Sequence, residues 1–375
     1  MKRFFKILII SIVSLLLILV VFAYLRYGGG TAYPNISTEP VMQESDLEAY
    51  FSYPEPVGNV AASRNTSYAT RVFMTVHPES RPENYKVLEI TGGQAKPYPD
   101  EASQKSLFAS VLGLYVDNQN RLWAIDHAEH GTGNVTLFAF DLETNQLAHK
   151  YIFSKEVAET GSFFNDLTVS PDGKYVLIAD VSFWAKSPSL VIYDVEKGVS
   201  RSLLDGHASV TSQGYVPVTP YKKMRFFGGL ADLMPGIDGL DVDWGGKYVY
   251  WAAMSHAEMY RLPLEVAANF ELSDEEIEKK VELVSKKPLS DGIRIDKDGT
   301  VLITDVENQG IYAVTPKGKG YTLIKDKRVR WADGLSLGSD GYWYLADSDI
   351  PDQMLQSKEH IAENKPYYVF RFKRK

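Results

Sequence analysis

The chain of 375 residues contains no cysteine. This absence excludes a disulfide framework, a thiolate zinc site and a cysteine nucleophile, so the fold must be stabilised by packing. An excess of positive charge is also missing, because 48 Asp and Glu outnumber 40 Lys and Arg and give a formal net charge of -8. Nucleic acid is therefore not an expected partner, since proteins that bind it usually carry a basic patch.

Two sequence motifs of nucleotide-binding proteins are missing as well. The sequence has neither a P-loop nor the glycine-rich turn of a dinucleotide-binding unit. Nucleotide hydrolysis and nicotinamide chemistry therefore lose support, and ligand binding or metal chemistry remains.

The N-terminus carries an apolar run at residues 7–25 that is long enough to cross a bilayer as a helix. Lys2, Arg3 and Lys6 precede the run, whereas only Arg26 follows it closely. The larger number of basic residues before the run predicts that the N-terminus lies in the cytoplasm.

We therefore predict a transmembrane anchor over residues 1–27, in a single-pass protein of the cell membrane with the rest of the chain outside the cytoplasm. The alternative is a signal peptide that is cleaved, which gives a secreted protein. Residues 22–26 contain no small-residue cleavage pattern, which favours the anchor.

Residues 28–57 contain three consecutive glycines and scattered prolines without periodicity, which is typical of a linker. From residue 58 onward one pattern recurs. A polar residue and often a glycine precede a short alternating strand, a turn such as KDG or PDG, and a second strand rich in Val, Ile, Tyr and Trp. Clear copies begin at Leu112, Asn165, Asp238, Asp291 and Asp333, and a degenerate copy begins at Asn59.

Copies that start about 40 to 75 residues apart suit one four-stranded propeller blade each. We therefore predict an all-β, six-bladed β-propeller over residues 58–375. The closing segment PYYVFRFKRK would pair with a strand near the N-terminal end and close the ring. Residues 205–236 suit a long excursion on one face, and residues 273–287 suit a short helix capped by Ser273 and Glu276.

Several motifs taken together, among them FFNDLTVSPDGKYVLIADVS at 163–182 and RVRWADGLSLGSDGYWYLAD at 328–347, resemble the major royal jelly protein and yellow family. The resemblance covers residues 58–372. It implies a six-bladed propeller, and some insect members bind biogenic amines in the central channel, while the yellow branch is associated with melanin-pathway chemistry. Insect members carry disulfides, which this chain lacks.

The repeat also resembles the gluconolactonase and senescence-marker-protein family, whose members hold a divalent cation at the channel mouth. Its asparagine and aspartate ligands fall on Asn165, Asp238 and Asp291, which would hold Ca²⁺ or another divalent cation as cofactor. The family's glutamate ligand falls on Leu112, and leucine cannot coordinate a cation. A site of this kind would therefore be rearranged.

The first polar residues of four copies, Asn165, Asp238, Asp291 and Asp333, should converge at the channel mouth. Converging like charges need a compensating cation, either a metal ion or an organic amine. A second set of aspartates lies at strand ends, namely Asp126, Asp180, Asp305 and Asp347. These either form a second acidic tier or bind loop amides, as aspartates beside turns often do.

His127 and His130 in DHAEHG have a spacing that is a weak zinc signal outside an HExxH helix. His127 would contact the ligand, or act as a general base, if it follows Asp126 to the channel face. Aromatic residues near the expected mouth loops would stack on a ligand or fill the core. They are Phe163, Phe164, Phe183, Trp184, Phe226 and Phe227.

The sequence thus predicts an extracytoplasmic, membrane-anchored propeller that binds a small ligand, cationic or metal-assisted, at its channel through Asn165, Asp238, Asp291, Asp333 and His127. One alternative is a divalent-metal-dependent lactonase or esterase in which Asp291 holds the cation and acts on water. A third class is a propeller that binds another protein, whose identity the sequence leaves open.

Overall fold

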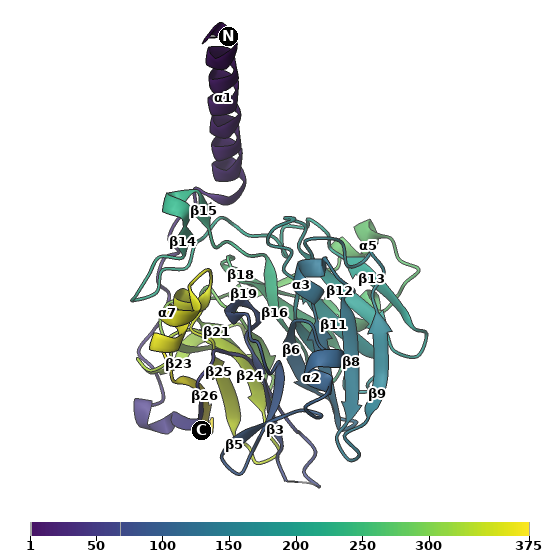
Figure 1. The fold of residues 1–375 in the computed structure, drawn as a ribbon. Coiled ribbons are helices and arrows are strands. Elements are labelled where there is room, and N and C mark those ends of the chain that lie inside the picture. Colours follow the sequence, from purple (N-terminus) through teal and green to yellow (C-terminus); the bar gives the residue numbers. More distant parts are fainter. Residues whose placement is uncertain (1, 68, 375) are drawn as a thin grey trace.

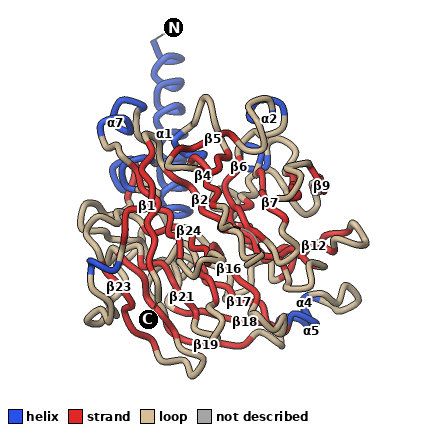
Figure 2. The backbone as a smooth tube through the Cα atoms, turned by 90° about the horizontal axis from the view of Figure 1, so that it is seen from below, coloured by secondary structure: helices blue, strands red, loops and turns tan. Residues whose placement is uncertain are grey.

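The computed structural model describes residues 2–67 and 69–374. Six four-stranded antiparallel sheets are arranged as the blades of a propeller (Figures 1 and 2), as the repeat predicts. We number the blades in chain order. The first three blades contain β2 (Val57–Ala62), β3 (Val72–Val76), β4 (Val87–Thr91) and β5 (Gln94–Pro97); β6 (Val111–Val116), β7 (Arg121–Asp126), β8 (Thr136–Asp141) and β9 (Leu147–Ile152); and β10 (Phe164–Val169), β11 (Tyr175–Asp180), β12 (Ser189–Asp194) and β13 (Val199–Leu203).

The other three blades follow the same order from the inner to the outer strand. They contain β16 (Ile237–Val242), β17 (Tyr248–Ala253), β18 (Glu258–Pro263) and β19 (Glu282–Lys286); β20 (Ile293–Ile295), β21 (Val301–Asp305), β22 (Gly310–Val314) and β23 (Gly320–Lys325); and β24 (Ala332–Leu337), β25 (Trp343–Asp347), β26 (Tyr367–Phe372) and β1 (Glu48–Tyr53). The degenerate copy at Asn59 is therefore the inner hairpin of blade 1.

The ring closes in blade 6 by pairing the two ends of the chain. Strand β1 lies antiparallel to β26, with Glu48 opposite Arg371 and Tyr53 opposite Tyr367. This confirms the predicted role of the C-terminal segment. Part of the expected linker is thus a propeller strand, and the chain before it is also attached, because Met42 N donates to Leu323 O over 2.9 Å.

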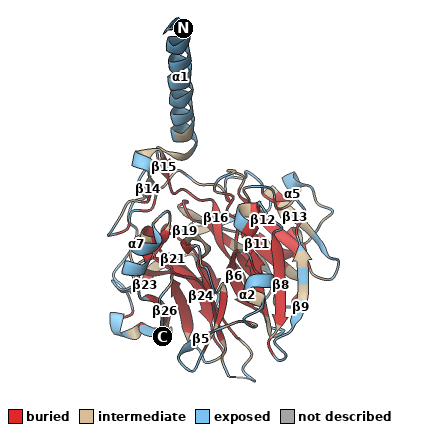
Figure 3. Ribbon diagram, in the orientation of Figure 1, coloured by how far each residue is buried: buried red, intermediate tan, exposed pale blue. Residues whose placement is uncertain are grey.

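The blades are held together by the apolar surfaces that they bury between them. Each pair of neighbouring blades shares one buried cluster, such as Trp123 of blade 2 with Phe164 of blade 3 and Leu302 of blade 5 with Phe370 of blade 6. Inner strands are almost entirely buried, whereas outer strands such as β9 are exposed or half-buried (Figure 3). A single blade buries neither face by itself, which is why the repeat occurs six times.

The inner strands share an irregularity that positions the channel residues. On five of the six inner strands the pairing with the second strand shifts near the start of the inner strand, as between Phe164 and Leu167 on β10. Such a bulge lets two consecutive residues escape strict alternation. Both Asn165 and Asp166 are therefore available to the channel.

The capping box predicted at Ser273 and Glu276 is present, but the predicted helix is too long. Helix α5 covers only Asp274–Glu278, and Glu282–Lys286 form β19 instead. Pairing with β18 completes blade 4, and this tertiary requirement overrides local helix propensity. The other short helices are η1 (Glu44–Asp46), η2 (Pro78–Ser80), α2 (Ser103–Ser106), α3 (Ala128–Gly131), η3 (Phe227–Gly229), α4 (Leu264–Ala267), α6 (Ile350–Gln353) and α7 (Lys358–Glu363).

Helix α1 (Lys2–Tyr27) stands away from the propeller and meets it beside the short strands β14 (Arg225–Phe226) and β15 (Ala231–Asp232) (Figure 1). It is long and apolar enough to cross a membrane, a property that signal sequences share. Strands β14 and β15 belong to the predicted excursion, residues 205–236, which we call the excursion loop.

Replacing a residue at the blade 5 to blade 6 contact tests the importance of ring closure. Phe370→Ala should lower the free energy of unfolding by about 3–5 kcal/mol, because it leaves a cavity in a fully buried cluster. Leu147→Ala on the exposed face of β9 should change it by about 0.5 kcal/mol or less. Guanidinium titration of the detergent-solubilised chain measures both, and equal losses would contradict closure as the main constraint.

Candidate ligand pocket at the channel mouth

A pocket opens at the channel mouth, where the inner strands of the blades begin. Asn165, Asp238, Asp291 and Asp333 all line this pocket, each from a different blade. The structure therefore brings together the four residues that the repeat pattern predicts to converge. Leu112 of blade 2 lines the same pocket and adds an apolar side chain to their ring.

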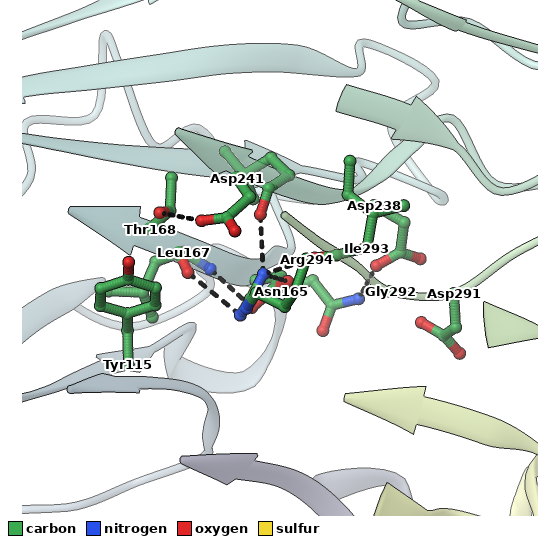
Figure 4. Close-up of polar contacts among 12 residues, drawn as sticks. Tyr115, Asn165, Leu167, Thr168, Asp238, Asp241, Asp291, Gly292, Ile293 and Arg294 are labelled. Atoms are coloured by element: carbon green, nitrogen blue, oxygen red, sulfur yellow. Dashed lines mark hydrogen bonds and ion pairs between the residues drawn. The ribbon is translucent and has the colours of Figure 1, made fainter. Parts of the chain in front are cut away.

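The three carboxyl groups are buried, and none forms an ion pair with a described lysine or arginine. Asn165 Nδ2 donates a hydrogen bond to Asp238 Oδ1 (Figure 4). Trp331 Nε1 donates to Asp291 Oδ2 over 2.6 Å. We call Asp238, Asp291 and Asp333 the carboxylate ring.

Burial shifts the ionisation of the carboxylate ring. Burial and then the neighbouring Asp291 and Asp333 raise the pKa of Asp238 well above its ordinary value. The pKa of Asp333 is raised in the same way, by burial and by Asp291. Burial raises the pKa of Asp291 to about 7 against the opposing hydrogen bond from Trp331. The ring therefore holds protons near neutral pH that an incoming cation can displace.

Apart from His77 and Glu79, the pocket lining outside Asn165 and the carboxylate ring is apolar. Phe163 and Phe183 come from the loops around β10 and β11, Phe226 and Leu233 from the excursion loop, and Met354 from the segment after α6. The excursion loop was predicted to lie on a binding face, and its residues do line the pocket. A polar floor and apolar walls suit a ligand with a charged or polar group and a hydrocarbon body.

A buried ion pair joins two inner strands farther along the channel. Arg294 donates to both carboxylate oxygens of Asp166, each over 2.9 Å, and also to Leu240 O over 2.7 Å. On the neighbouring strand, Asp241 accepts from Thr168 Oγ1 and from Ile295 N (Figure 4). These polar groups satisfy one another, and none of them lines the pocket.

The strand-end aspartates hold loops instead of forming a second acidic tier. Asp126 accepts from the backbone amides of Ala109, Ser110 and Ala128. Asp180, Asp305 and Asp347 likewise accept from nearby backbone amides, and Asp347 also pairs with Arg330. Of the two expectations for these residues, the structure supports the loop-amide one.

His127 does not line the pocket. Its side chain is buried, its Nδ1 accepts from His130 N, and its ring packs against Phe163, which does line the pocket. Burial and the neighbouring His130 lower the pKa of His127 well below its ordinary value. A ligand in the pocket would therefore touch Phe163 and would not touch His127 directly.

Two pocket residues were not predicted. His77 and Glu79 follow β3 in the degenerate first copy, and both line the pocket. Glu79 Oε1 lies 3.0 Å from His130 Nε2, and although burial opposes the change, this hydrogen bond lowers the pKa of Glu79. His77 directly follows the end of β3, as His127 directly follows the end of β7, while Val76 takes the position of the strand-end aspartate. This shared histidine position is the signal that could have revealed it.

The run GLSLG at residues 334–338 has the spacing of a hydrolase serine motif, although it does not form a nucleophile elbow. A nucleophile elbow requires a sharp strand-to-helix turn. Ser336 instead lies within β24, pairs with Tyr344, and accepts from Ala62 N over 2.9 Å. The serine is therefore part of the channel wall and is not a nucleophile.

The fold and this pocket define a six-bladed propeller with a candidate ligand pocket at its channel mouth. The family profile described as major royal jelly protein matches residues 109–329, more than half of the chain. The chain therefore belongs to the major royal jelly protein family. No curated protein sequence matches it.

Solved propellers share the fold. The calcium-binding protein regucalcin from Agrobacterium tumefaciens aligns over 89% of this chain and 95% of its own, with 12% identity and a TM-score of 0.56. A gluconolactonase from Xanthomonas campestris aligns over 87% and 88%, with 12% identity and a TM-score of 0.55. A luciferin-regenerating enzyme aligns over 87% and 94%, with 10% identity and a TM-score of 0.52. Such low identities establish the architecture alone.

The raised pKa values predict how stability depends on pH. A carboxyl whose pKa is higher in the folded state stabilises the fold below its unfolded value near 4, and this contribution is lost as pH rises through the folded value. Asp238→Asn should therefore flatten the fall in Tm between about pH 5 and 8 and raise Tm at pH 8 by a few degrees.

Asp205→Asn, at an exposed position, is the matched control and should leave the pH profile unchanged. Differential scanning fluorimetry across this pH range measures both variants. A profile for Asp238→Asn that parallels the wild type would contradict an ionisation penalty at the carboxylate ring.

Proposed function

We propose that the protein is a membrane-anchored propeller that binds a small cationic ligand in the pocket at its channel mouth. The observation that carries this proposal is the carboxylate ring, three buried acids from three blades, none of which forms an ion pair with a described residue. The buried Lys287 attracts Asp238 only from beyond ion-pair distance. Elsewhere in the channel the fold neutralises a buried acid, as Arg294 does for Asp166. The ring is left for a partner from outside.

The physical argument rests on the cost of buried charge. Like charges in a buried site disfavour ionisation, and a bound cation removes this penalty by electrostatic attraction in a medium of low dielectric constant. Phe163, Phe183 and Phe226 offer ring faces and edges to the body of the ligand or to its charge. An organic amine with an apolar body satisfies both parts of the pocket.

A divalent cation would use Asn165, Asp238 and Asp291. In the described part of the chain, no three His, Asp or Glu side chains are placed so that they could hold a metal ion. The ring also meets Leu112, and Asp291 already accepts from Trp331. The side chains would have to rearrange around a metal, so we put the organic cation first and keep metal assistance as a tested alternative.

The contacts at the base of α1 support an uncleaved anchor. Arg26 Nη2 donates to Ala185 O over 2.7 Å, and Tyr27 Oη donates to Trp184 O over 2.8 Å. Cleavage after the apolar run would remove contacts that join the helix to the propeller. The basic residues before the run support a cytoplasmic N-terminus.

One observation favours a second function, a metal-dependent lactonase: the chain shares the fold of the Xanthomonas campestris gluconolactonase. Asp291 would then both hold the cation and act on water. Propellers support many unrelated functions, so this likeness ranks below the local geometry. A role in binding another protein predicts neither ligand stabilisation nor turnover.

Thermal melting of the full chain in lipid nanodiscs tests the proposal. Phenethylamine should raise Tm, whereas its uncharged isostere phenethyl alcohol should not, because only the amine neutralises the carboxylate ring. Asp238→Asn and Asp291→Asn should each weaken the effect at least about tenfold in concentration, if a charge-assisted contact contributes 1.5–3 kcal/mol. Asp205→Asn is again the control.

The same assay with EDTA, Ca²⁺ and Mg²⁺ tests metal assistance. A rise in Tm with Ca²⁺ alone that Asp291→Asn abolishes, together with lactone turnover, would replace the binding proposal with the lactonase. Equal responses to the amine and the alcohol would overturn the role of the carboxylate ring.

A further inference from the structure

We propose that the pocket mouth lies against the membrane surface and that its ligand is an amphiphile that enters from the bilayer. This inference rests on the proposed pocket and anchor. Beyond them, the inference states that the pocket faces the membrane and that an amphiphile reaches it. The supporting observation is the position of α1 relative to the mouth.

The end of α1 is attached to the loops on two sides of the mouth. Arg26 and Tyr27 bond to the loop between β11 and β12, residues 181–188, through Ala185 and Trp184. A few residues later, Gly30 N donates to Asp232 Oδ2 over 2.7 Å in the excursion loop. The helix therefore leaves the propeller from the face on which the pocket opens (Figure 1).

The end of the apolar run shows how close this face of the propeller lies to the bilayer. The run ends at Leu25, so the edge of the bilayer lies close to Tyr27. The ring of Trp184 is 5.8 Å from that of Tyr27, which puts it at the same level. Trp and Tyr concentrate at membrane–water interfaces, where one end of the ring is apolar and the other is wet.

The rim of the pocket is apolar and exposed at this level. Trp184 is 42% exposed, Phe227 64% and Leu355 52%, and all three line the pocket. They come from three separate segments: the loop after β11, the excursion loop and the turn after α6. Lys186 Nζ lies 4.3 Å from the ring centre of Phe183, so a positive charge sits beside the rim, as is common near lipid headgroups.

The polarity of the pocket also changes along the direction from its floor to the membrane. Its floor is the carboxylate ring, and its walls and rim toward α1 are apolar. An amphiphile that enters with its amine first places the charge on the floor and keeps its hydrocarbon in contact with the walls, the rim and the bilayer. A ligand from bulk water would instead have to pass between the rim and the lipid headgroups.

Brominated lipids test the placement of the mouth, because bromine quenches tryptophan only at short range. The full chain is reconstituted in phosphatidylcholine vesicles with or without lipids brominated near the headgroup end of the acyl chain. Trp184→Phe should remove the quenched part of the emission. Trp244→Phe should retain it, because Trp244 hydrogen-bonds Ile295 O in the turn after β16, away from the mouth.

Dodecylamine and dodecanol in nanodiscs test the ligand class. Dodecylamine should raise Tm in the wild type and not in Asp238→Asn, and dodecanol should do so in neither. Quenching that is absent, or equal in Trp184→Phe and Trp244→Phe, overturns the membrane-facing mouth even if phenethylamine binds. A response to phenethylamine without one to dodecylamine overturns the amphiphile. Quenching at Trp184 without any amine response removes the proposed function and the amphiphile.

Discussion

The pairing of β1 with β26 is the constraint on which the rest of the structure depends. It joins two segments from opposite ends of the chain and fixes the ring at six blades. Once the ring is closed, the inner strands must begin around one opening, and their first polar residues must meet there. The carboxylate ring is therefore a consequence of closure and of the bulges at the inner strands. Electrostatic repulsion within the carboxylate ring destabilises the fold, and the packing between blades offsets this cost.

The channel shows two ways of handling buried charge within one fold. Near its middle, Arg294 pairs with Asp166 in a bidentate contact, and neighbouring strands supply the remaining partners. At its mouth, Asp238, Asp291 and Asp333 are buried together, and none of them forms an ion pair with a described lysine or arginine. The first arrangement neutralises its own charge, whereas the second leaves a local field that favours a positive ligand. The contrast within one channel is the main reason for assigning the mouth, and not the channel as a whole, to function.

Much of this architecture is predictable because it is repetitive. The polar residue, strand, turn and strand recur with enough regularity to give the six blades, the closing strand and the convergence of Asn165, Asp238, Asp291 and Asp333. The misses have local causes. Residues 282–286 carry helix-like charges but complete blade 4 as β19, a requirement set by tertiary pairing. His77 lies in the degenerate copy, where the pattern is weakest. His127 follows a strand end as expected, yet the packing of Phe163 separates it from the pocket, and no sequence pattern reports which of two neighbouring rings faces inward.

The most direct test of the central claim is to count protons when a cation binds. A positive group that enters the carboxylate ring must displace protons that the raised pKa values retain near neutral pH. Calorimetric titration of the wild-type chain with phenethylamine at pH 7, in buffers of different ionisation enthalpy, measures that number. The account predicts proton release upon binding, with a smaller release in Asp291→Asn. Binding without proton exchange would contradict it, because the ligand would then lie away from the ring.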